Sequence, residues 1–409
     1  MVAILKILLV FSLIIILLRK RISLGTTMLV SSGLLGLLFG LGPAPLLKQF
    51  FLTLIHPATI SLISALVLIM ILESVMRNTG MLKAMTDSLL KLPLNPLVLI
   101  ASIPAIIGFL PSAGGARFSA PLVDQATSNM SFQPEDKVFI NYWFRHMWEY
   151  CLPLYPGLLL AAHISGVPLG TLILWQWPFA VIWALLGYWY IFRPFGGDKE
   201  AAAATEAGTE ALPKQEEGHS LMDLIKTTWP LWCTVLLVLA HVSIVISIIG
   251  VLLLLIIQKR YPLQPLIKTI FEPLTARIVF LTWGTLAFKD VLEASGAVNQ
   301  LSSAISSFGF SPVIILILLP LAVGMLTGLL QACIGVSFPL VMSFIEPSGA
   351  YVMLAYISGV AGVMISPVHL CLVLSIEYFK ADFTRSYKPL LMPSLLVVGI
   401  ALGAFAVLR

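Results

Sequence analysis

The sequence predicts an all-α polytopic membrane protein made of two inverted repeats, each with about five transmembrane helices and one re-entrant hairpin. Its apolar composition, an internal repeat and the placement of its basic residues support this fold. Hydrophobic residues form 59% of the 409 residues and charged residues only 11%, whereas soluble domains average about 45–50% and about 25%. Because a bilayer core of about 30 Å needs about 20 apolar residues per helix, roughly ten spans are expected.

The first apolar run, Ile4–Leu18, is expected to be a retained helix and not a signal peptide. Arg19-Lys20-Arg21 follows it, and no small-residue cleavage site does. The segment 228–258 fits either two short spans that meet near His241 or one long tilted helix. The expected spans are 4–18, 27–42, 57–76, 138–163, 169–192, 228–242, 244–258, 277–291, 350–377 and 390–408, with hairpins near 97–130 and 311–346.

Matching motifs occur in the same order in both halves of the chain, at a spacing that falls from 220 to 214 residues. Such self-similarity indicates a duplicated architecture. A single match could arise by chance in so apolar a chain, but an ordered series rich in Pro and Gly is not expected to. The matched pairs include Pro45 and Pro265, Gly80 and Gly296, Pro104 and Pro320, Gly108 and Gly324, Ser119 and Ser337, Tyr142 and Tyr356, and Pro153 and Pro367.

The repeat divides the chain into residues 1–195, a linker at 196–223 and residues 224–409. The linker contains seven acidic residues and two lysines, so we expect a flexible acidic cytoplasmic connector. With Arg19–Arg21 placed in the cytoplasm, 18 of the 24 basic residues lie on the cytoplasmic side, as the positive-inside rule requires. Five spans per half then orient the two halves oppositely. The basic residues belong to loops, so no nucleic-acid partner is expected.

Helix breaks in the membrane are tolerated only where protein buries them or where they line a cavity, so paired breaks indicate a binding site. The predicted breaks are 110–117 and 326–337 in the two hairpins, and 151–157 and 365–369 in the spans that follow them. After the break at 110–117, Arg117 adds positive charge to a helix N-terminus, which attracts anions. Plain turns, proline kinks and packing through small residues are the structural alternatives. The predicted solute-binding residues are Ser112, Gly114, Gly115, Arg117, Pro153, Tyr155, Thr327, Gln331, Gly335, Ser337, Ser366, Pro367 and His369.

Three ionisable residues, Arg145, His146 and Glu149, lie within the span 138–163. Arg145 and Glu149 are four residues apart and are expected to share a helix face. They form either a structural ion pair or an ion-coupling group in which His146 or Glu149 carries protons and Arg145 holds an anion. Asp124 is two helical turns from Arg117 and is a candidate ion-pair partner for it.

The four cysteines, Cys151, Cys233, Cys333 and Cys371, lie in expected membrane segments and lack metal-ligand spacing. They are therefore expected to be buried thiols. The sequence predicts no disulfide, metal site or cofactor.

Three motifs, Gly108–Ala116, Arg145–Glu149 and Gln331–Pro339, resemble those of domain-of-unknown-function family 401, a family of prokaryotic integral membrane proteins. That family is similar to the ion transporter superfamily of dicarboxylate symporters, arsenite permeases and gluconate permeases. The resemblance implies an elevator-type transporter in the prokaryotic inner membrane, with a homodimer as the usual assembly. The chain lacks the Ser-Asn-Thr motifs of dicarboxylate symporters. The resemblance therefore implies neither a dicarboxylate substrate nor sodium coupling in particular, and the coupling ion stays open between a proton and sodium.

The predicted function is secondary active transport of a small anionic solute across the lipid bilayer, coupled to a proton or sodium gradient. An intramembrane enzyme is one alternative because His146-x-x-Glu149 could support acid–base chemistry, but the chain has no HExxH or GxSxG motif. The chain is therefore not expected to be an enzyme. A membrane assembly or export component is another alternative, which deletion of residues 198–220 would distinguish, because a transporter should tolerate it.

Overall fold

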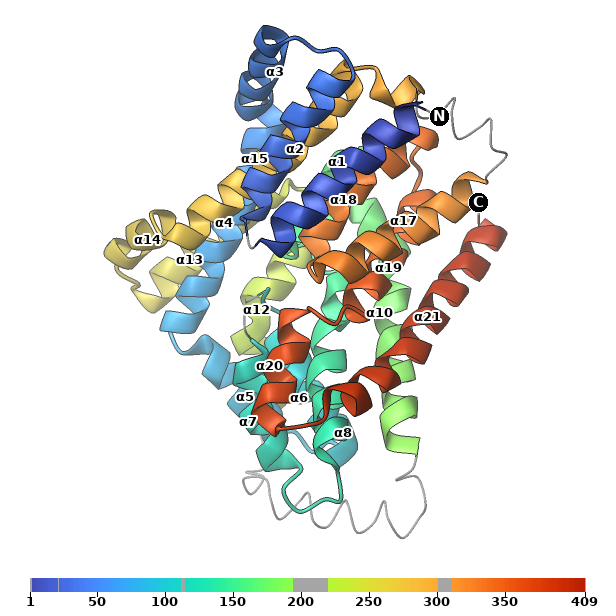
Figure 1. The fold of residues 1–409 in the computed structure, drawn as a ribbon. Helices are drawn as coiled ribbons and strands as arrows, with labels where there is room; N and C mark the ends of the chain where they lie inside the picture. Colours follow the sequence, from blue (N-terminus) through green and yellow to red (C-terminus); the bar gives the residue numbers. More distant parts are fainter. Residues whose placement is uncertain (1, 21, 112–114, 194–219, 301–310, 409) are drawn as a thin grey trace.

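The computed structural model describes residues 2–20, 22–111, 115–193, 220–300 and 311–408, and every regular element in these ranges is a helix. Figure 1 shows α6, α7, α8 and α20 toward the lower end of the molecule and α1, α2, α3, α17 and α18 toward the upper end. The first half comprises α1 (Val2–Arg19), α2 (Leu24–Leu38), α3 (Pro43–Ile55), α4 (Pro57–Asn78), α5 (Met81–Leu90), α6 (Pro96–Gly108), α7 (Ala116–Ala126), α8 (Pro134–Trp143), the 3₁₀ helix η1 (Phe144–Tyr150), α9 (Pro156–Ser165) and α10 (Leu169–Phe192). The second half comprises α12 (Ser220–Leu239), α13 (Ile244–Lys259), α14 (Leu263–Ile270), α15 (Pro273–Ala294), α17 (Pro312–Thr327), α18 (Leu330–Val341), η3 (Met342–Phe344), α19 (Gly349–Met364), α20 (Leu370–Phe379) and α21 (Phe383–Leu408).

Five of the described helices are long and apolar enough to cross a membrane: α1, α4, α10, α12 and α21. The outer face of α10 illustrates their surface. Its exposed apolar side chains recur every three or four residues, at Leu174, Trp177, Val181, Leu185 and Trp189, which places them on one helix face. A continuous apolar face of this length fits lipid and not water. The helices thus bear out the expected membrane protein.

Two matched pairs of positions in the two halves begin or end helices in the same way. Ser23 precedes α2 and Ser243 precedes α13; each has ψ 142° and accepts a hydrogen bond from the backbone N–H three residues later at 3.3 Å. These are N-caps, which satisfy one free N–H of each helix. Gly80 and Gly296 follow α4 and α15 with φ of 72° and 67°, a left-handed conformation that glycine adopts readily.

The segment 228–258 forms two helices. α12 ends at Leu239, α13 begins at Ile244, and His241 lies between them with φ 62°. The turn resolves the choice that the sequence left open. Most of the predicted linker, residues 194–219, lies outside the described residues, and the last four linker residues form the first turn of α12.

Helices of each half pack on helices of the other in reciprocal pairs. α2 contacts α15 while α13 contacts α4, and α3 contacts α15 while α14 contacts α4. The α2–α15 contact depends on two glycines, because a Cβ on Gly25 or on Gly284 would lie 2.5 Å from the backbone of the other helix. Trp283 Nε1 also donates to the Phe50 carbonyl at 3.0 Å. We call α2, α4, α13 and α15 the frame; it contacts the hairpins and broken helices through the pairs α15–α18 and α4–α9.

Candidate functional site

The first hairpin packs against η1 through two glycines. A Cβ on Gly108, at the end of α6, would overlap the carbonyl oxygen of Arg145, and a Cβ on Gly115, before α7, would overlap the Arg145 guanidinium. At Gly108 only glycine permits this approach, because the neighbouring atoms are backbone. At Gly115 an added methyl group would force the Arg145 side chain to move. Arg145 is buried. Its guanidinium lies beside Gly115, so its positive charge is at the N-terminus of α7. The predicted site residues Ser112 and Gly114 lie outside the described residues.

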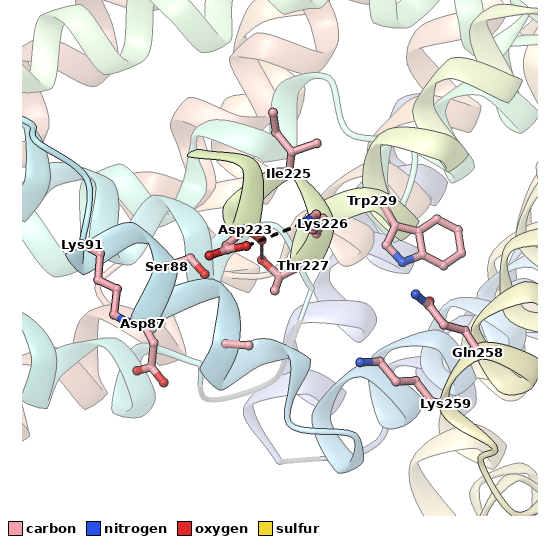
Figure 2. A pocket seen from close by; sticks show the side chains of 11 residues that line it. Asp87, Ser88, Lys91, Asp223, Ile225, Lys226, Thr227, Trp229, Gln258 and Lys259 are labelled. Carbon is pink, nitrogen blue, oxygen red and sulfur yellow. Dashed lines mark hydrogen bonds and ion pairs between the residues drawn. The ribbon is translucent and has the colours of Figure 1, made fainter. Parts of the chain in front are cut away.

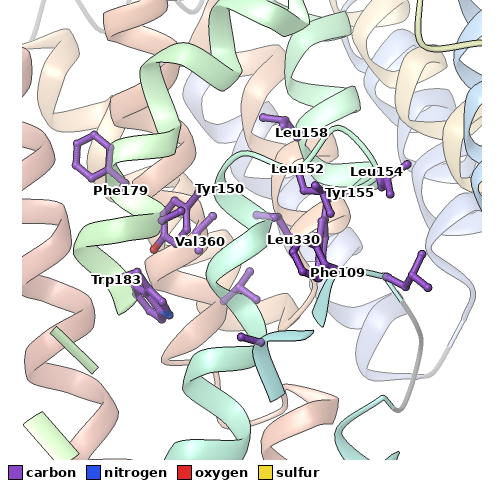
Figure 3. Packing of buried hydrophobic residues seen from close by; sticks show 14 of the residues in the cluster. Phe109, Tyr150, Leu152, Leu154, Tyr155, Leu158, Phe179, Trp183, Leu330 and Val360 are labelled. Atoms are coloured by element: carbon purple, nitrogen blue, oxygen red, sulfur yellow. The ribbon is translucent and has the colours of Figure 1, made fainter. Parts of the chain in front are cut away.

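The break predicted at 151–157 lies between η1 and α9, at residues 151–155. Pro153 is within it, and Pro156 begins α9. Tyr155 Oη donates to the Gly108 carbonyl at 2.5 Å, so the break is joined to the first hairpin. Figure 3 shows Phe109, Tyr155 and Leu330 in one buried cluster, where residues from both halves meet.

The prediction that Arg145 and Glu149 share one helix face is wrong, because Phe144–Tyr150 is a 3₁₀ helix. Residues three apart align in a 3₁₀ helix, whereas residues four apart align in an α-helix. Glu149 accordingly faces His146, with 4.0 Å between Glu149 Oε1 and His146 Nε2.

The second hairpin packs against the break predicted at 365–369, which lies between α19 and α20. Gly328, with φ 62°, turns the chain between α17 and α18. A Cβ there would lie 3.0 Å from the backbone nitrogen of His369 and from Ser366 Oγ. Ser366 Oγ donates to the Met325 carbonyl at 2.7 Å. Pro367 lies between Ser366 and His369, so this break too is joined to a hairpin end.

Matched tyrosines connect the two breaks reciprocally. Tyr142 Oη donates to the Met364 carbonyl at 3.1 Å, and Tyr356 Oη donates to the Glu149 carbonyl at 2.7 Å. Each tyrosine therefore satisfies a carbonyl at the helix break of the other half. α7 likewise contacts α20 while α18 contacts α9.

The hairpins also pack in matching ways within each half. Gly108 approaches the Arg145 carbonyl, and a Cβ on its counterpart Gly324 would lie 2.6 Å from the carbonyl oxygen of Gly359. Residues 145 and 359 are 214 apart, which is the spacing of the tyrosine pair. The same hairpin-to-helix contact thus occurs twice.

Two histidines and a cysteine meet where the breaks meet. One ligand atom each from His146, His369 and Cys371 lies within 4.8 Å of the others. The His146 and His369 rings are edge to face, with centroids 4.9 Å apart. His146 and His369 are predicted site residues that the structure brings together. Cys371 was not predicted, because no local spacing links it to His146.

Several predicted residues lie away from this cluster. The Arg117 side chain is 67% exposed and lies 3.6 Å from Glu377. The expected Arg117–Asp124 pair is not formed; Asp124 instead pairs with Lys137 at 2.6 Å, a partner on α8 that sequence spacing did not reveal. Two predicted hydroxyl groups are bonded within their own helices: Thr327 Oγ1 donates to the Val323 carbonyl and Ser337 Oγ donates to the Cys333 carbonyl. Gly335 packs against Thr285 of α15, and Gln331 is half-buried.

A polar cavity of about 660 Å³ opens between α5, α12 and α13, away from the breaks. Figure 2 shows Asp87 and Lys91 on one side and Gln258 and Lys259 on another. Asp223 and Lys226 form an ion pair there at 3.9 Å. The mixture of exposed charges is that of a solvated helix end.

A protein family described as "Protein of unknown function (DUF401)" matches residues 3–408. The chain belongs to this family. The resemblance read from the motifs is thereby confirmed for the family. No curated protein matches the chain.

Proposed function

We propose that the chain is a secondary active transporter of a small anionic solute, coupled to a proton or cation gradient, and built from two inverted repeats. The observation that carries the proposal is the meeting of two broken helices, each joined to the end of a helical hairpin. In a membrane such breaks are stable only inside protein or beside a cavity. Paired broken helices from two repeats are the usual location of transporter binding sites.

The reciprocal contacts favour the duplication. Under a two-fold relation, a residue of one half contacts its partner and its counterpart makes the same contact in reverse. The bonds from Tyr142 to Met364 and from Tyr356 to Glu149 follow this rule to within one residue, because the counterpart of Met364 at the spacing of 214 is Tyr150. So do the pairings of α7 with α20 and of α18 with α9. An odd number of spans per half would then invert one half relative to the other.

Converging positive charge favours an anion. α9 and α18 begin against each other, since a Cβ on Gly157 would lie 2.6 Å from Leu330. α20 begins at the tip of the second hairpin, and α7 begins beside the Arg145 guanidinium. Helix N-termini carry partial positive charge and free N–H groups. The solute would bind among these ends and be released when a hairpin moves away from its break.

A thermal-shift screen of the purified full-length protein tests the proposal. Organic and inorganic anions are compared with cations and amines, with and without sodium and at two pH values. A ligand that binds only the folded state raises the melting temperature. An anion that does so should also be carried into proteoliposomes. A shift produced only by cations or amines would refute the anion assignment.

Arg117 is the informative variant in that screen. Its guanidinium is exposed beside Glu377, so Arg117→Ala should leave basal stability nearly unchanged, by less than about 1 kcal/mol. Loss of the anion shift in this variant, with the shift retained in Arg385→Ala, would assign Arg117 to the solute pathway. A shift that persists in Arg117→Ala would exclude Arg117 from anion binding. Arg145 would then be the one remaining arginine of the two predicted to bind the anion.

A further inference from the structure

We propose that His146, His369 and Cys371, with Glu149 as the fourth ligand, bind one divalent transition metal ion of the zinc class where the two broken helices meet. The two halves contribute equally, with His146 and Glu149 from η1 and His369 and Cys371 from the start of α20. A bound ion would therefore connect the two breaks. Binding of the ion can be tested without knowing the solute and without a transport assay.

The two imidazoles are oriented as metal ligands are. His146 Nδ1 lies 2.6 Å from the Tyr142 carbonyl, and His369 Nδ1 lies 3.2 Å from the Val363 carbonyl. A carbonyl only accepts hydrogen bonds, so each Nδ1 carries the proton and each Nε2 keeps its lone pair. Metal-bound histidines commonly donate their other ring N–H to a backbone carbonyl, which holds the ring in place.

Glu149 supplies an oxygen without a partner. Its Oε2 is buried and has no hydrogen bond among the described residues, while Oε1 is 4.0 Å from His146 Nε2. A buried polar atom that lacks a partner is costly. Coordination to a cation would satisfy this oxygen.

The distances fit a tetrahedral ion after a small closure. Zinc–nitrogen bonds of about 2.0–2.1 Å and zinc–sulfur bonds of about 2.3 Å place tetrahedral ligand atoms about 3.3–3.6 Å apart. The His146, His369 and Cys371 ligand atoms lie within 4.8 Å of one another. Side-chain movements on the order of 1 Å would bring these three ligand atoms to bonding distance. Glu149, whose Oε1 lies 4.0 Å from His146 Nε2, would move in as the fourth ligand.

The donor chemistry selects the class of ion. Imidazole nitrogen and thiolate sulfur favour zinc and similar transition metals, whereas calcium and magnesium prefer oxygen. One thiolate and one carboxylate bring two negative charges, which neutralise a divalent ion in an interior where unbalanced charge is costly. Val368, next to His369, is 61% exposed, so the site lies close to the surface of the chain.

Cobalt(II) titration of the metal-stripped, full-length protein in detergent tests the proposal. Cobalt occupies nitrogen–sulfur sites and reports thiolate ligation by a near-ultraviolet charge-transfer band and tetrahedral geometry by visible bands. We expect both bands to saturate at one equivalent and to disappear when zinc is added. A wild-type protein that shows no charge-transfer band would overturn the site, whether or not the protein transports anything.

Cysteine variants assign the ligand. Cys371→Ser should abolish the charge-transfer band, whereas the matched control Cys333→Ser should retain it, because Cys333 Sγ is buried in α18 and donates to the Pro320 carbonyl instead. His369→Gln should weaken cobalt affinity by at least about 10-fold. A band that survives Cys371→Ser would overturn the assignment. If Cys371→Ser does not fold, the zinc-sensitive wild-type spectrum still decides.

Discussion

Three tyrosines that are wholly buried near the helix breaks permit a direct test of the reciprocal hydrogen bonds. Tyr142 and Tyr356 donate to carbonyls of the opposite break, whereas the Tyr150 hydroxyl has no hydrogen-bond partner among the described residues. Replacement by Phe removes only the hydroxyl. Tyr142→Phe and Tyr356→Phe should therefore destabilise the protein, and Tyr150→Phe should not.

The expected magnitude follows from burial. Loss of a donor that leaves a buried carbonyl unsatisfied costs about 1–3 kcal/mol. Hydrogen bonds in membrane proteins average about 0.6 kcal/mol, with a maximum near about 1.7 kcal/mol, because the unfolded chain finds other partners. We therefore expect about 0.6–1.7 kcal/mol for each variant. The larger loss should occur at Tyr356, whose bond is 2.7 Å, and not at Tyr142, whose bond is 3.1 Å.

The apparent free energy of unfolding, measured by SDS titration of each purified variant, checks this prediction. Tyr150→Phe serves as the control, since it should be neutral or slightly stabilising. Equal losses in all three variants would mean that the loss of stability does not come from these two hydrogen bonds. No loss at Tyr142 and Tyr356 would refute the account of the two breaks as mutually supporting.

Other predictions concern packing and the linker. Gly108→Ala and Gly324→Ala should each destabilise the protein by about 1–3 kcal/mol, because the added methyl meets a carbonyl oxygen, while Gly33→Ala, in open space on α2, should be neutral or stabilising by about 0.5–1 kcal/mol in the same SDS titration. Gly335→Ala should lower the transport rate and leave solute affinity unchanged, because its methyl would press α18 against Thr285 of α15; reduced affinity with an unchanged rate in proteoliposome assays would contradict this. Replacement of residues 198–219 by a short Gly-Ser segment should preserve transport, whereas an assembly component would lose its function.

The sequence predicted the positions of the breaks well because their cause is local. Proline at 153 and 367 removes a backbone donor, and Gly328 allows the left-handed turn of the second hairpin. The helical register around Glu149 was less predictable. Nothing in Phe144–Tyr150 distinguishes a 3₁₀ helix from an α-helix by composition, and the tighter turn depends on packing of η1 against the first hairpin.

The histidine–cysteine cluster was beyond prediction for a different reason. His146 and Cys371 are separated by 225 residues, and metal motifs are recognised only when ligands lie close together in sequence. The internal repeat did align the two breaks. Yet the repeat places Tyr155 opposite His369, so it offers no counterpart from which a shared ligand set could be read. Only the packing of η1 against the start of α20 brings the ligands together.

The proposed ion and the two tyrosine bonds have a common mechanical consequence. All of them join one broken helix to the other, and none joins either break to the frame of α2, α4, α13 and α15. Interactions within a moving body do not oppose its motion, whereas interactions that cross its boundary must be broken. The breaks and hairpins are thus bonded to one another as one unit, as the proposed transport by movement past the frame would require. Removing the ion should consequently lower both the stability of the protein and its affinity for the solute. It should not block the proposed movement of the unit past the frame.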